Sequence, residues 1–130
     1  MSLIAAMAWS AILLWLMIVV AGVWKYTAWT PSGLKKMMSN RDEVVAISPA
    51  NARAERAARN MLENIVVFIA LAAAAGLSGR AAGMAETGAT IFFWARLIYW
   101  PVYVAGIVYA RTALWAVSIV GLAMIALALL

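Results

Sequence analysis

The sequence of 130 residues contains no cysteine and no histidine. Without cysteine the chain can form no disulfide, no thiolate metal site and no cysteine nucleophile. Without histidine it lacks the commonest metal ligand and the commonest general base. Charge is also scarce, because charged residues make up 12% of the chain, whereas a soluble domain has about 25%. We therefore expect no metal site and no catalysis by a cysteine or histidine side chain.

Apolar residues are abundant instead, at 68% of the chain. This share excludes an ordinary soluble domain and a disordered chain. The length allows a single domain, residues 1–130. Apolar runs, each near the length of about 20 residues that a spanning helix needs, predict an all-α fold: an integral membrane four-helix bundle, antiparallel and up-down. The expected spans are residues 3–25, 50–78, 87–110 and 112–130.

The connections between the spans carry most of the charge. Ten basic and five acidic residues give a net charge of +5, and seven of the ten basic residues lie between Lys25 and Arg59. The positive-inside rule places this first connection in the cytoplasm. Four spans then put both termini outside and return the short third connection, around Arg111, to the cytoplasm. The positive charge thus indicates orientation, and we expect no nucleic acid partner.

One face of the second span carries polar side chains. At about 100° per residue, four residues lie on this face: Arg53, Arg56, Asn60 and Glu63. Asn64 and Arg59 lie beside it. An ion in hydrocarbon costs at least ~2.5–3.5 kcal/mol, so these groups should face protein or a wet cavity. An alternative is that Glu63 forms an internal ion pair with Arg56 or Arg59 and only locks the packing.

The third span repeats this pattern with Arg96, Tyr99 and Tyr103 on one face. Arg96 lies in the middle of the run and needs a partner, for which Glu63 is the expected residue. Pro101 should kink the helix and open a cleft beside the tyrosines. The structural alternatives are that the two tyrosines only fill space between helices and that Arg111 anchors a helix end at the membrane surface.

Together these side chains suit a small anion with several carboxylates and one ammonium group. Arginine binds carboxylate through a planar fork of N–H donors. Glu63 is the group that would meet the ammonium. An arginine or a tyrosine hydroxyl would hold a thiolate.

Three motifs resemble those of the membrane-associated proteins in eicosanoid and glutathione metabolism, the MAPEG family. They are Arg56-x-x-Arg-Asn-x-x-Glu-Asn64, Arg96-x-x-Tyr-x-x-x-Tyr103 and Arg111-Thr-Ala-Leu-Trp115. The sequence is more similar to the bacterial members than to the mammalian leukotriene or prostaglandin synthases. The resemblance implies a homotrimer in a bacterial inner membrane, with glutathione as co-substrate in three cytoplasm-facing sites between subunits.

The resemblance also implies a role for each matching residue. Arg111 is similar to the arginine proposed to stabilise the glutathione thiolate, and Tyr103 would be the second catalytic group. Lys25 would reach the site from the neighbouring subunit. The other residues implied to contact glutathione are Arg56, Arg59, Asn60, Glu63, Asn64 and Tyr99.

Two functions are compatible with these residues. The first is a membrane-bound glutathione transferase that joins glutathione thiolate to lipophilic electrophiles, with lipid-hydroperoxide reduction as a related reaction. This chemistry needs no protein nucleophile and no metal, in agreement with the missing cysteine and histidine. The second is a non-catalytic membrane protein, either a binder of a glutathione-like anion or a bundle whose charges are structural. A small four-helix drug exporter would want a carboxylate in the first span, which has none.

Overall fold

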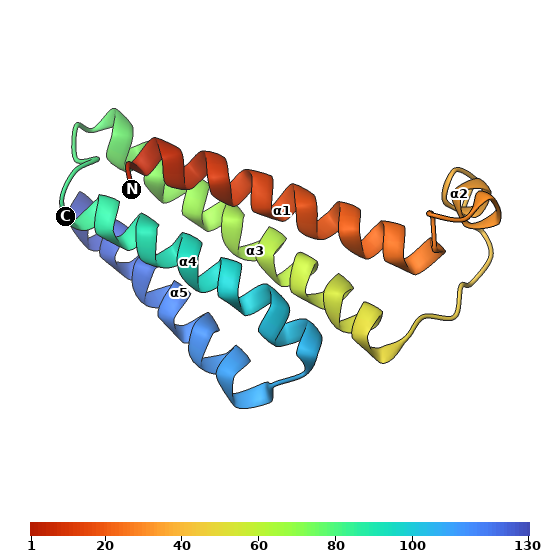
Figure 1. Ribbon diagram of the computed structural model, residues 1–130. Coiled ribbons are helices and arrows are strands. Elements are labelled where there is room, and N and C mark those ends of the chain that lie inside the picture. The colour runs from red at the N-terminus through yellow and green to blue at the C-terminus, as the bar shows by residue number, and fades with distance from the viewer.

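The computed structural model describes all residues, 1–130, and is entirely helical. The helices are α1 (Leu3–Tyr26), α2 (Pro31–Met37), α3 (Pro49–Leu77), α4 (Met84–Ala105) and α5 (Val108–Leu129). The four long helices run alternately in opposite directions, with both termini at one end and α2 at the other (Figure 1). The prediction of an all-α chain is confirmed, whereas the expected count of four helices is corrected by α2.

The short helix α2 folds inside the first connection, where only polar loop was expected. Thr30 caps its start, because the Thr30 hydroxyl accepts a hydrogen bond from the Gly33 amide at 3.1 Å, and Pro31 occupies the first position. The helix lies close against the end of α1. A Cβ atom at Gly33 would collide with the carbonyl oxygens of Tyr26 and Thr27.

Helices α1, α3 and α5 are each long and apolar enough to cross a membrane. Large apolar side chains cover the outer surface, and Ile4, Trp15 and Val66 are each more than half exposed. A surface of this kind matches lipid and not water. The chain is therefore an integral membrane protein. Helix α4 has 22 residues, as α5 has, but it is not among these three helices. It contains Glu86, Arg96 and Pro101 within its apolar run.

Helices α4 and α5 make the most extensive contact of all pairs. The approach depends on Gly88 and Gly121, since a Cβ atom at Gly88 would lie 2.5 Å from the Gly121 carbonyl oxygen. Small residues allow the same close contact between helices in membranes generally. Phe68 of α3 and Phe92 of α4 stack with ring centroids 4.3 Å apart and hold these two helices together.

The predicted position of the third connection is wrong. Helix α4 ends at Ala105 and α5 begins at Val108, so Arg111 lies in the first turn of α5. The break falls at Gly106, which takes the left-handed conformation (φ 82°) that ends many helices. Arg53 of α3 fixes this end of α4, because its Nε donates to the Val104 carbonyl at 2.8 Å.

Candidate functional site

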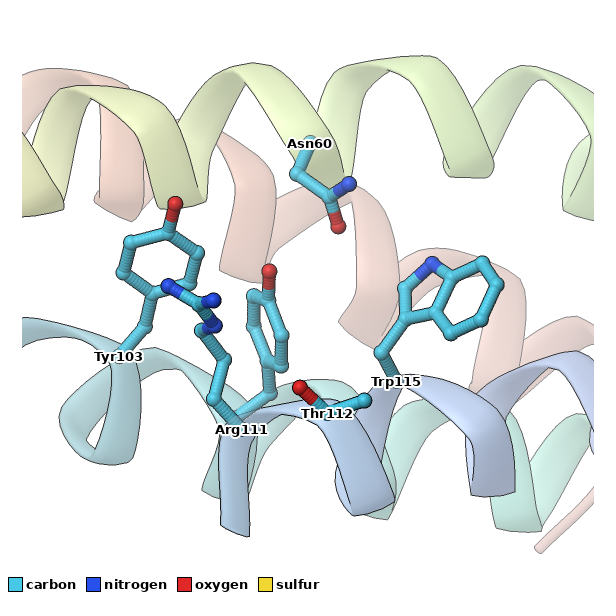
Figure 2. Close-up of a pocket in the computed structure, with 6 residues that line it drawn as sticks. Asn60, Tyr103, Arg111, Thr112 and Trp115 are labelled. Carbon is cyan, nitrogen blue, oxygen red and sulfur yellow. The ribbon is translucent and has the colours of Figure 1, made fainter. Parts of the chain in front are cut away.

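A polar cavity lies between α3, α4 and α5, toward the end of the bundle opposite the termini. Its volume is about 260 Å³. Six residues line it: Asn60, Tyr99, Tyr103, Arg111, Thr112 and Trp115 (Figure 2). Four of them were candidates from the sequence, namely Asn60, Tyr99, Tyr103 and Arg111. The structure thus gathers about half of the predicted site in one place.

The side chains in this cavity offer donors to an anion. Arg111 lies over Tyr103, with the guanidinium carbon 4.7 Å from the ring centroid. The rings of Tyr99 and Tyr103 meet edge to face at 5.3 Å. Figure 2 shows Asn60 on α3 at the opposite side of the cavity from Arg111 and Thr112 on α5. No carboxylate lines the cavity, so a bound anion would meet one cation, hydroxyl groups and an amide without a competing negative charge.

Arg96 lies behind this cavity and is almost completely buried, with 1% of its surface exposed. Its Nη1 donates to the Asn60 Oδ1 at 2.7 Å. The prediction that Glu63 is the partner of Arg96 is therefore wrong. Asn60 faces α4, and Glu63, three residues further along α3, is rotated by about 60° from it and is exposed.

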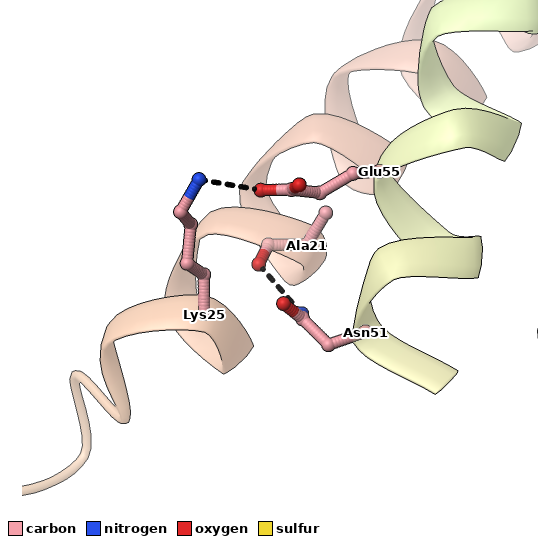
Figure 3. A network of polar contacts seen from close by, with 4 residues as sticks. All are labelled: Ala21, Lys25, Asn51 and Glu55. Carbon is pink, nitrogen blue, oxygen red and sulfur yellow. Dashed lines mark hydrogen bonds and ion pairs between the residues drawn. The ribbon is translucent and has the colours of Figure 1, made fainter. Parts of the chain in front are cut away.

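A second cavity, of about 360 Å³, lies between α1 and α3. Its charged lining consists of Lys25, Arg41, Glu55 and Arg59. Lys25 and Glu55 form the one ion pair within 4 Å in the chain, at 2.9 Å, and the Asn51 amide donates to the Ala21 carbonyl beside them (Figure 3). Two predicted site residues, Lys25 and Arg59, thus line a different cavity from Asn60 and Arg111 within one chain.

The remaining predicted residues line neither cavity. Arg56 and Glu63 are exposed on α3. Asn64 is half-buried, and its Nδ2 donates to the backbone carbonyl of Asn60 at 2.8 Å. Glu63 forms no ion pair with Arg56 or Arg59, since the one ion pair joins Lys25 and Glu55. The internal ion pair that would lock the packing is therefore absent from the single chain.

The linings of the two cavities also include residues that were not candidates from the sequence, among them Glu55, Thr112 and Trp115. Thr112 and Trp115 follow Arg111 by one and four residues on α5, so helical spacing would have placed Trp115 on the face of Arg111. That signal was hidden because Arg111 was expected in a connection. Glu55 meets Lys25 across two helices, and nothing in the spacing of one helix predicts such a contact.

The fold and the cavity define a class: a helical integral membrane protein with a cationic, hydroxyl-lined cavity among its helices. A family model described as the MAPEG family matches residues 2–130, and the chain belongs to this family. The resemblance seen in the three motifs is thereby confirmed over the whole chain. Comparison with curated proteins and with solved structures gave no match.

Proposed function

We propose that the protein is a membrane-bound glutathione transferase that conjugates glutathione thiolate to lipophilic electrophiles dissolved in the bilayer. The observation that carries this proposal is the cavity where Arg111 lies over Tyr103 beside Tyr99, with no carboxylate in the lining. Membership of the MAPEG family supports a glutathione-related reaction. Lipid-hydroperoxide reduction is a second reaction that the same thiolate would perform.

The reaction needs a thiolate at neutral pH, because the thiolate and not the thiol is the nucleophile. A thiol pKa lowered from about 8.5 to about 6.5 requires ~2.7 kcal/mol of preferential stabilisation. One or two charge-assisted hydrogen bonds of ~1.5–3 kcal/mol each supply this. Arg111 and the Tyr103 hydroxyl are the proposed donors. The sulfur then attacks the electrophilic carbon, and the leaving group departs with its electron pair.

The proposal includes a homotrimer with the site between subunits. In one chain, Arg56 and Glu63 are exposed on α3, and lipid is a costly environment for such charges. A neighbouring copy would shelter them and bring its own Lys25 and Arg59 toward the cavity that holds Arg111. Glutathione carboxylates would then meet the basic groups, its ammonium would meet Glu63, and Asn60 and Asn64 would hold the peptide.

We place the protein in a bacterial inner membrane with α4 as a fourth span. The cavity residues Tyr103 and Arg111 lie beside the α4–α5 connection. This connection is at the end of the bundle opposite the termini, the end that also holds α2 and the basic first connection (Figure 1). The positive-inside rule makes this end cytoplasmic and puts both termini outside. A reporter fused after Leu130 should behave as periplasmic, and cytoplasmic activity of that fusion would contradict the orientation.

The direct test of the proposed function is thiolate formation. Detergent-solubilised protein is titrated with glutathione while thiolate absorbance is followed, with S-methylglutathione as a control that has no thiol to ionise. Saturable absorbance at neutral pH, with conjugation of a chlorodinitrobenzene, is the expected result. Binding without thiolate formation would identify a non-catalytic anion binder, and no binding would leave the charges structural.

A further inference from the structure

Buried Arg96 has a use beyond packing. We infer that Arg96 is a positioning residue behind the cavity. Arg96 holds Asn60 so that the Asn60 amide nitrogen stays free for the ligand, and its positive charge favours a ligand with a negatively charged sulfur group over one that is neutral there. The inference rests on the proposed function, because the ligand it discriminates is the thiolate of glutathione.

The first step concerns the charge, which has no counterion. Arg96 has 1% of its surface exposed, and its Nε and Nη2 have no hydrogen-bond partner in the chain. No carboxylate lies within 4 Å of it. A buried, unpaired ion is strongly unfavourable, and a well-packed apolar side chain in its place is often neutral or stabilising. Packing alone therefore does not account for an arginine at this position.

The second step concerns the distance from that charge to the cavity. The guanidinium carbon of Arg96 lies 5.2 Å from the centroid of the Tyr99 ring and 5.6 Å from that of Phe92. Both contacts lie within the range of a cation–π interaction, which offsets part of the burial. Tyr99 also lines the cavity. The charge thus lies one aromatic ring behind the cavity, where Arg111 is the other cation and no acidic residue cancels the field.

The third step concerns the orientation of Asn60. The guanidinium group can only donate hydrogen bonds, so the Asn60 atom that meets Nη1 at 2.7 Å must be the carbonyl oxygen. The amide nitrogen with its two hydrogens is then left free. Since Asn60 lines the cavity, Arg96 turns it into a hydrogen-bond donor, the polarity that an anion requires.

The test compares two glutathione derivatives that differ in charge at sulfur. Glutathione sulfonate carries a negative charge where the thiolate would be, and S-methylglutathione is neutral there. Calorimetry in one detergent gives the ratio of their affinities. Arg96→Gln should lower this ratio about tenfold, because it removes a positive charge that lies one aromatic ring from the cavity and attracts an anion there at an effective dielectric constant of about 20. Affinity for S-methylglutathione should change by less than about threefold.

Two variants serve as controls. Arg96→Lys keeps the charge and loses the planar fork, so the affinity ratio should stay near the wild-type value while both affinities fall slightly. Arg80→Gln removes one positive charge at the opposite end of the bundle, where Arg80 donates to the Leu129 carbonyl, and should leave the ratio unchanged.

The outcomes separate this inference from the proposed function. If the wild type binds neither derivative, the proposed function fails. If the wild type binds both and Arg96→Gln weakens both equally, the charge role of Arg96 is overturned. If Arg96→Gln does not fold, the folded Arg96→Lys variant decides. Lysine keeps the positive charge, so a collapse of the affinity ratio in that variant overturns the inference as well.

Discussion

Replacement of Arg111 by alanine should separate thiolate activation from glutathione binding. The guanidinium lies 4.7 Å from the centroid of the Tyr103 ring, on a half-buried side chain that has no ion pair in the chain. The fold therefore loses little beyond one cation–π contact, worth roughly 0.5–1 kcal/mol. The change should remove a donor from the cavity without opening the α4–α5 interface.

The size of the effect follows from the contacts that Arg111 would make with the sulfur. A charge-assisted hydrogen bond contributes about 1.5–3 kcal/mol, and the rest of its Coulomb field adds up to about 1 kcal/mol. Since each 1.36 kcal/mol is a factor of ten in rate, conjugation should slow by about one to three orders of magnitude. Glutathione affinity should stay within a few-fold, because Arg111 would contact little else of the tripeptide.

The assay is the initial rate of conjugation with a chlorodinitrobenzene as a function of pH. The rate of Arg111→Ala should rise at high pH, because the thiol then ionises without help from the protein. Arg111→Lys keeps the charge and should retain part of the rate, and Arg80→Ala should behave as wild type. An unchanged rate and an unchanged pH profile in Arg111→Ala would remove Arg111 from the mechanism and leave Tyr99 or Tyr103 as the thiolate donor.

Two further substitutions test binding and packing. Glu63→Gln should weaken glutathione binding about tenfold or more with little change in thermal stability, because Glu63 is exposed and unpaired in the chain; lower stability with unchanged affinity would contradict this. Gly88→Ala should destabilise the fold by about 1–3 kcal/mol, because its Cβ would lie 2.5 Å from the Gly121 carbonyl oxygen. The matched control, Gly76→Ala, has no atom within 4 Å of the added Cβ, and equal melting temperatures for the two variants would refute the packing argument.

The ends of the long helices follow local signals that a sequence displays. Helix α1 covers Leu3–Tyr26 where 3–25 was expected, and α3 covers Pro49–Leu77 where 50–78 was expected. Ser48 and Pro49 form a standard helix start. The break at Gly106 was missed because its neighbours are apolar and no charge marks it. Helix α2 was missed because seven residues are too few to show a helical period.

The candidate site was predictable where its residues share one helix face. Tyr99 and Tyr103 line the same cavity because they lie four residues apart on α4. The pairing of Arg96 with Asn60 was not predictable, because it depends on how α3 and α4 are rotated about their axes. The ion pair between Lys25 and Glu55 depends on the position of α1 along α3 in the same way.

Native mass spectrometry of the protein released from detergent micelles tests the central claim most directly, because one spectrum reports both assembly and ligand. The expected result is three chains carrying glutathione, with a neutral tripeptide of unrelated sequence not retained. Since the proposed site lies between copies, glutathione should be absent from any dissociated single chain. A spectrum dominated by monomer or dimer, or a trimer that retains no glutathione when glutathione is saturating, would contradict the account.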